Sequence, residues 1–239
     1  MTATRKTAAL VGLLFLTATA TFIAAEQFIT PVLNRPDYLL GASEDASVLT
    51  VGALLAFVQG LAVVGLAIFM FPLVKRTSEP LALGYLGLQI AMLGVTLLYV
   101  VAPLMVIALA GGVRDGTIAA SAAPSLGSLV KAIHDVAIVL LYLVTAVSGT
   151  IFAFLLYRSR LVPRSIAVLG LIGYPVLVAG AVLDMFGVID VTQGIGLVSI
   201  APGGLFELIL PLWLLVKGFR HPVTPEASTG DIGLVLEPA

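Results

Sequence analysis

Six long, unbroken apolar runs are the feature that most constrains how this chain folds. A helix needs about 20 apolar residues to cross the hydrocarbon core of a bilayer. A transmembrane barrel would instead show alternating polarity in segments of roughly ten residues. Because lipid admits only helices or closed barrels, the runs predict an all-α bundle of six transmembrane helices. We place these spans at Thr7–Ala25, Val48–Val74, Leu81–Ala110, Leu129–Tyr157, Ser165–Gly187 and Ile195–Phe219.

Composition supports a membrane location. Of the 239 residues, 60% are hydrophobic and 10% are charged, whereas soluble domains are typically about 45–50% apolar and about 25% charged. The lipid bilayer is therefore the expected partner. The net charge of −1 and the lack of a basic face predict no nucleic-acid partner. The chain has no cysteine, which excludes disulfides, thiolate metal sites, iron–sulfur clusters and cysteine nucleophiles.

The basic residues predict the orientation of the bundle. Nine of the twelve Lys and Arg residues fall at the chain ends or in the second and fourth connections, all on one side. They are Arg5, Lys6, Lys75, Arg76, Arg158, Arg160, Arg164, Lys217 and Arg220. The positive-inside rule places both termini in the cytoplasm. An even number of spans agrees with both ends lying on one side, and we expect the inner membrane of a bacterium.

Two segments need separate interpretation. The first apolar run has a basic start and a small-residue end, but it is longer than a signal-peptide core of about 7–15 residues. We therefore expect it to stay as a membrane helix within a transmembrane domain at 1–220. The segment 221–239 is rich in Pro, Ser, Thr and Gly, and we predict a disordered cytoplasmic tail there.

Glu207 is the acid placed deepest in a predicted span. It precedes Lys217 by ten residues, which is roughly 15 Å in a core about 30 Å thick. Pro202-Gly203-Gly204 comes before it and Pro211 follows, so we expect a loosened or broken helix there. Broken helices at mid-membrane form binding sites in many transporters. The alternative is a neutral Glu207 that bonds a neighbouring helix and only supports packing.

A second set of polar residues falls near the outer boundary of the core. Glu26, Asp135 and Asp184 each lie about 30 Å or slightly more from the basic anchors. His134 adjoins Asp135, and Lys131 has the i,i+4 spacing of a salt bridge with it. Glu26, His134 and Asp135 are expected to converge on the mouth of a pocket. Alternatively, these charges simply reach the membrane interface, which is the simpler interpretation for Asp184.

Other features complete the candidate site and the packing pattern. Gln89, within the third span, and Trp213, within the sixth, join Glu207, His134, Asp135, Glu26 and Asp184 as candidate ligand-binding residues. Carboxylates on separate helices with one histidine make a weak metal site, so we predict no metal and no cofactor. Gly173, Gly180 and Gly187 recur every seven residues and predict one close-packing face on the fifth helix.

Three stretches carry a resemblance to a known family. They are Lys6-Thr7-Ala8 with Gly12 and Glu26, the stretch from His134-Asp135 to Pro163-Arg164, and Glu207-Leu208 with Leu212 to Gly218. Over nearly the whole chain up to about Phe219, the sequence resembles the bacterial integral membrane family called domain of unknown function 4386. The resemblance implies a multi-pass membrane protein and implies no activity.

Three functions remain open from the sequence. The first is binding or transport of a small lipophilic or amphipathic ligand in a pocket around Glu207. The second is an intramembrane enzyme acting on an isoprenoid or other lipid-like substrate. Its catalytic acid would be Glu207 and its base Asp135 or Glu26. The third is a structural or regulatory subunit whose polar residues only pair helices. The sequence fixes neither the oligomeric state nor the ligand.

Overall fold

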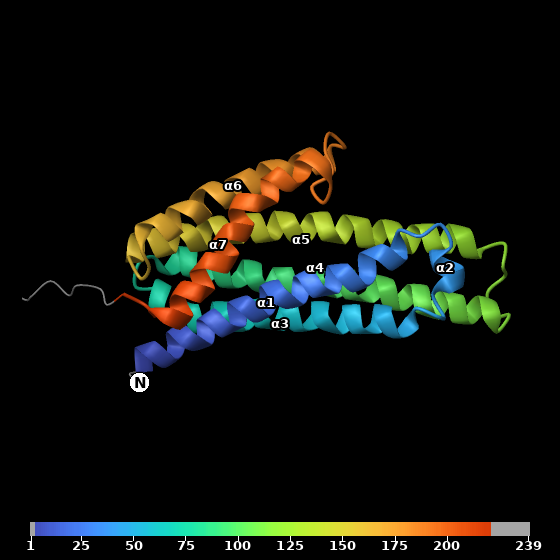
Figure 1. Cartoon of the computed structure of the whole chain (residues 1–239), viewed down its shortest axis with the longest axis horizontal. Helices are drawn as coiled ribbons and strands as arrows, with labels where there is room; N and C mark the ends of the chain where they lie inside the picture. The colour runs from blue at the N-terminus through green and yellow to red at the C-terminus, as the bar shows by residue number, and fades with distance from the viewer. Residues whose placement is uncertain (1–2, 221–239) are drawn as a thin grey trace, which may run out of the picture.

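The computed structural model describes residues 3–220, and these fold almost entirely as helices. Six of the helices are long and apolar enough to cross a membrane, which confirms the predicted fold class of a multi-pass helical protein (Figure 1). The elements are α1 (Ala3–Leu33), α2 (Tyr38–Gly41), α3 (Ala46–Val74), α4 (Glu79–Arg114), α5 (Ala123–Ser159), α6 (Arg164–Met185), the 3₁₀ turn η1 (Gly194–Gly196) and α7 (Leu197–Val216).

Several helices are longer than the apolar runs that predicted them. α5 has 37 residues, which is about 55 Å at 1.5 Å per residue and well beyond a core of about 30 Å. The polar ends of α4 and α5 continue the helices, so this hairpin projects past the others in Figure 1. Hydropathy detects where a helix lies in lipid, whereas a helix ends where its backbone hydrogen bonds end.

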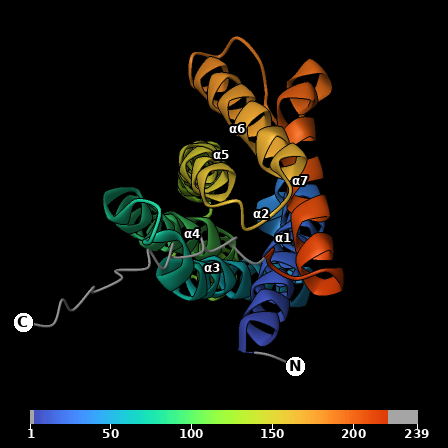
Figure 2. The ribbon, with the colours of Figure 1, turned by 90° about the vertical axis from the view of Figure 1, so that its left-hand side faces the viewer.

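The six long helices form a ring that follows the order of the chain. α1 packs on α3, α3 on α4, α4 on α5, α5 on α6 and α6 on α7, and α7 closes the ring against α1. Figure 2, seen from one end, shows α5 facing α1 and α3 across the bundle interior. A ring of this kind leaves space at its centre that side chains must fill or line.

Glycine permits the close contact between α6 and α7. A Cβ atom on Gly173 would lie 2.5 Å from the backbone nitrogen of Gly203 and 2.7 Å from the carbonyl carbon of Pro202. Gly180 likewise meets the Ser199 side chain. Small residues let backbones approach in this way. The predicted face ends there, because Gly187 lies beyond the helix in a turn with a φ of +68°.

The predicted break in the last helix is wrong. α7 runs as one helix through both Pro202 and Pro211, and its ribbon is continuous in Figure 1. Each proline still removes a backbone donor. Contact with the neighbouring helix α6 along Pro202 and Gly203 holds the segment helical, as happens for many prolines in membrane helices.

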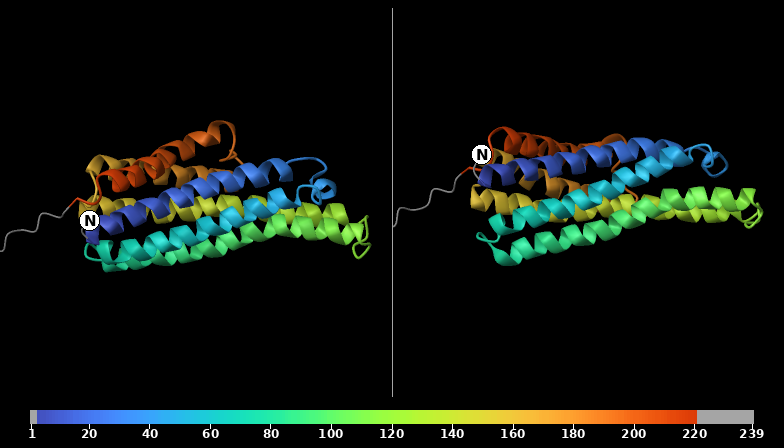
Figure 3. Two further views of the ribbon diagram at one scale, coloured as in Figure 1. Left: turned by 60° about the horizontal axis from the view of Figure 1, so that its bottom comes forward. Right: turned by 90° about the horizontal axis from the view of Figure 1, so that it is seen from below.

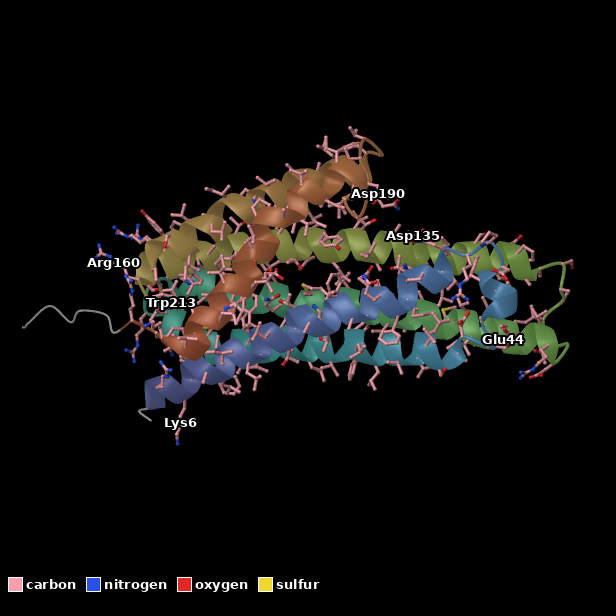
Figure 4. All side chains as sticks on the ribbon, in the orientation of Figure 1. Lys6, Glu44, Asp135, Arg160, Asp190 and Trp213 are labelled. Atoms are coloured by element: carbon pink, nitrogen blue, oxygen red, sulfur yellow. The ribbon has the colours of Figure 1, made fainter. Side chains whose placement is uncertain are left out.

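Both ends of the described chain lie at the same end of the bundle. Lys6, Arg160 and Trp213 mark this basic end in Figure 4, and Glu44 marks the other. Arg5 donates from Nη2 to the carbonyls of Leu215 and Val216, at 3.1 and 2.8 Å. It thereby satisfies two of the unpaired carbonyls at the C-terminus of α7. The predicted tail at 221–239 lies outside the described residues.

Candidate functional site

A cavity of about 410 Å³ occupies the centre of the ring. All six long helices contribute side chains to its lining. The lining is mostly apolar, with a few polar groups among the apolar side chains, which is the composition expected of a small-molecule site. Both Glu207 and Glu26 belong to this lining.

Glu207 points into the cavity from α7 and is held by two hydroxyl groups. Tyr174 on α6 donates to Oε1 at 3.2 Å, and Thr19 on α1 donates to Oε2 at 3.4 Å. Tyr174 is almost completely buried, with 2% of its surface exposed. The carboxyl group is therefore fixed by both helices that flank α7 in the ring.

Glu26 is the second acid of the cavity and has a similar arrangement. The Tyr99 hydroxyl on α4 donates to Oε1, and Thr30 donates to Oε2 at 2.9 Å. Glu26 follows Thr19 by seven residues, so it lies on the same face of α1 about 10 Å further along the helix axis. The two carboxyl groups thus face one cavity at two depths.

Gln89 belongs to the same lining and has one unsatisfied acceptor. Its Nε2 donates to the Tyr85 hydroxyl at 3.2 Å, but Oε1 is buried and accepts no hydrogen bond from any described residue. Gln89 is only 7% exposed. Because buried polar atoms are nearly always paired, this oxygen is an exception, and it is buried within the wall although Gln89 belongs to the lining.

Aromatic rings form much of the remaining wall. Six rings line the cavity, those of Phe15, Phe22, Tyr85, Tyr142, Phe152 and Tyr174. Several of them pack on one another: Tyr85 stacks on Phe152 with centroids 4.9 Å apart, and Phe22 meets Tyr142 edge to face at 6.0 Å. These contacts fix the rings around the central space.

The cavity reaches the outer surface of the bundle between α1 and α7. Its lining includes Ile23 on α1 and Leu197 and Leu208 on α7, which are 53%, 50% and 47% exposed. The two helices touch at the basic end, where Gly12 faces Pro211 and Leu215. They diverge toward the opposite end (Figures 1 and 3). Exposed apolar side chains at this seam would face lipid in a membrane.

Four of the predicted site residues lie outside this lining. Asp135 forms a salt bridge with Lys131 at 3.1 Å, and Asp184 accepts a bond from the Val191 backbone at 2.6 Å. Trp213 lies at the basic end, with the Arg220 guanidinium over its ring. His134 and Asp135 were expected at the pocket mouth with Glu26. Only Glu26, Glu207 and Gln89 come together at the cavity.

His134 is separated from the cavity by Tyr99, which does not itself line the cavity, and by the lining residue Glu26. Its ring packs on Tyr99 with centroids 4.7 Å apart, and Tyr99 is the donor to Glu26. Both imidazole nitrogens are buried without a hydrogen-bond partner among residues 3–220, and Nδ1 lies 3.5 Å from Asp135. His134 therefore adjoins the site through Tyr99 without facing the space itself.

The site predicted from the sequence did not include the hydroxyl groups that hold the two acids; Tyr99 and Tyr174 were expected to serve packing or interhelical hydrogen bonding, and both donate between helices. Thr19, Thr30, Tyr99 and Tyr174 resemble many other membrane-helix residues in type and spacing. One signal was present in the sequence, since Thr19 and Glu26 have the seven-residue spacing that places two residues on one helix face. Over the described part of the chain, no group of three or more His, Cys, Asp or Glu residues is arranged to hold a metal ion.

A ring of six spanning helices around a carboxyl-bearing cavity defines the class as a polytopic membrane protein with an internal pocket. Residues 10–218 match the family described as Domain of unknown function (DUF4386). The chain belongs to that family, as its resemblance predicted. No curated protein and no solved structure matches it.

Proposed function

We propose that the protein binds a small lipophilic or amphipathic molecule in the central cavity, with Glu207 as the main polar contact. The observation that carries the proposal is the cavity itself. Its volume of about 410 Å³ falls within the roughly 300–1,000 Å³ of ligand pockets. It lies among helices that cross the membrane, and carboxyl groups face it. A purely structural subunit needs no such space.

The position of the opening supports a ligand that comes from the bilayer. Ile23, Leu197 and Leu208 connect the cavity lining to the outer surface. A molecule with a hydrocarbon portion enters between α1 and α7 without leaving the apolar phase. Its polar portion then reaches Glu207. The setting we infer is the cytoplasmic membrane of a bacterium with both termini inside, in accordance with the positive-inside rule.

Because two carboxyl groups face one cavity, an intramembrane enzyme is the second candidate function. Glu207 as acid and Glu26 as base would suit rearrangement of an isoprenoid or lipid-like substrate. The offset of about 10 Å along α1 is long for two groups acting on neighbouring atoms. Asp135, the other candidate base, is outside the lining. Binding therefore has the stronger support.

Native mass spectrometry of the purified protein, with organic extraction of bound molecules, tests the proposal. We expect a specific lipophilic molecule on the wild type, at least tenfold less of it on Glu207→Gln, and unchanged binding on Glu79→Gln. Glu79 is an exposed acid at the start of α4 and does not line the cavity. Equal occupancy in all three proteins would refute a role for Glu207. Conversion of the extracted molecule on incubation with protein would identify an enzyme.

A further inference from the structure

The two cavity carboxyl groups have no positively charged partner from the protein. All four groups that donate to Glu26 and Glu207 are neutral hydroxyls. Within residues 3–220, neither acid forms an ion pair, and no Lys, Arg or His lines the cavity. An ionised carboxylate in a partly buried, apolar site is stabilised by a cationic partner, and since no described residue supplies one, a bound cation could supply it.

The aromatic residues of the lining also favour a cationic ligand over an anionic one. Gln89 belongs to the lining, but its unpaired Oε1 is buried within the wall, so it adds no acceptor at the cavity surface. Six aromatic rings surround the space, and ring faces attract cations, with quaternary ammonium groups among the best ligands. The carboxyl groups and the rings belong to different residues, and both favour a positive ligand group over an anionic one.

We propose that the ligand is a lipophilic cation, an amine or ammonium group carrying a hydrocarbon chain, whose positive group binds between Glu207, Glu26 and the aromatic wall. This inference rests on the proposed binding function and adds the charge of the ligand. The hydrocarbon chain lies toward the seam of α1 and α7, where Ile23 and Leu208 form the edge of the lining. Ionised carboxylates would repel an anionic lipid headgroup, so anionic lipids of the surrounding bilayer should bind more weakly.

The test compares three probes with the same twelve-carbon chain: dodecyltrimethylammonium, dodecanol and dodecanoate. Each is added at equal concentration to the purified full-length protein, and bound probe is counted by native mass spectrometry. We expect the ammonium probe to bind on the order of tenfold more than the alcohol, with the carboxylate weakest. In Glu26→Gln/Glu207→Gln the advantage of the ammonium probe over the alcohol should disappear while the alcohol still binds.

A third variant separates failure of this inference from failure of the proposed function. Gly204 lines the cavity, and a Cβ atom added there would meet no atom within 4 Å, so the side chain of Gly204→Leu begins in open space at the cavity lining. Equal binding of all three probes, each reduced by Gly204→Leu, would overturn the charge preference and leave a lipophilic site. Probe binding that Gly204→Leu does not reduce would overturn both. If the double variant does not fold, the ranking of the probes on the wild type decides.

Discussion

At the scale of single residues, the rotation of each helix decides which of its polar side chains reach the cavity. Counting residues from the basic anchors placed Glu207 and Glu26 at two levels of the membrane, and both face the cavity. The same counting put Asp135 and Asp184 at the level of Glu26. These two instead pair with Lys131 and with a loop amide. Helix rotation separates the two groups, and uniformly apolar helices give no periodic pattern that reveals rotation.

The hydrogen bond from Tyr174 to Glu207 yields a prediction at this scale. Tyr174→Phe keeps the buried ring and removes the donor to Oε1. We expect a double-mutant cycle with Glu207→Leu, which removes the acceptor, to show a coupling free energy of about 0.6 kcal/mol, and at most about 1.7 kcal/mol, the range for hydrogen bonds within membrane proteins. The free energy of unfolding of each variant is measured by denaturation in mixed detergent micelles. Strictly additive effects of the two substitutions would mean that the bond contributes nothing.

At the scale of helices, the apolar runs predicted that six long helices exist and in which order they follow. Packing between the helices determines whether each one is continuous and where it contacts its neighbours. Pro202-Gly203-Gly204 looks like a helix breaker in isolation, but the contact with Gly173 on α6 keeps α7 continuous. The glycine face predicted on α6 is used at Gly173 and Gly180. Gly187 does not belong to this face because the helix ends at Met185. An apolar pattern places such boundaries only to within a few residues.

The close contact of α6 and α7 predicts unequal effects of two identical substitutions. In Gly173→Ala, the added methyl group would meet backbone atoms of Pro202 and Gly203 that cannot move freely. We expect a loss of about 1–3 kcal/mol in the free energy of unfolding, as for other overpacked sites.

Gly84→Ala on α4 is the matched control, because its added methyl group meets nothing within 4 Å. It should be neutral or stabilise by up to about 1 kcal/mol through helix propensity. Thermal unfolding in detergent reports both variants. Equal stability of Gly173→Ala and Gly84→Ala would contradict the packing described for α6 and α7.

At the scale of the whole molecule, sequence predicted that both termini lie on the same side of the membrane, and the two ends of the described chain, residues 3 and 220, lie at one end of the bundle. The ring and its cavity could not be predicted from the sequence, because the pattern of six apolar helices does not specify which helices are neighbours. Closure of α7 on α1 depends on contacts such as those of Arg5 with Leu215 and Val216. Those contacts link residues that are more than 200 positions apart.

Orientation in the membrane follows from the basic end and is testable because the chain has no cysteine. Thr77→Cys lies between α3 and α4 at the basic end, and Ser121→Cys lies between α4 and α5 at the other. An impermeant maleimide added to intact cells should label Ser121→Cys, and should label Thr77→Cys only after lysis. The reverse pattern would place both termini outside and contradict the predicted orientation.

The central claim is that the cavity is a ligand site, and one comparison tests it most directly. Gly204→Leu adds a side chain at the cavity lining, whereas Gly84→Leu adds the same side chain at an exposed position on α4, outside the lining. Native mass spectrometry of both purified variants and the wild type measures the bound small molecule. We predict that the wild type and Gly84→Leu carry it and that Gly204→Leu, folded and equally stable, has lost it. Equal occupancy of the two variants, or a wild type that carries nothing specific, would contradict the account.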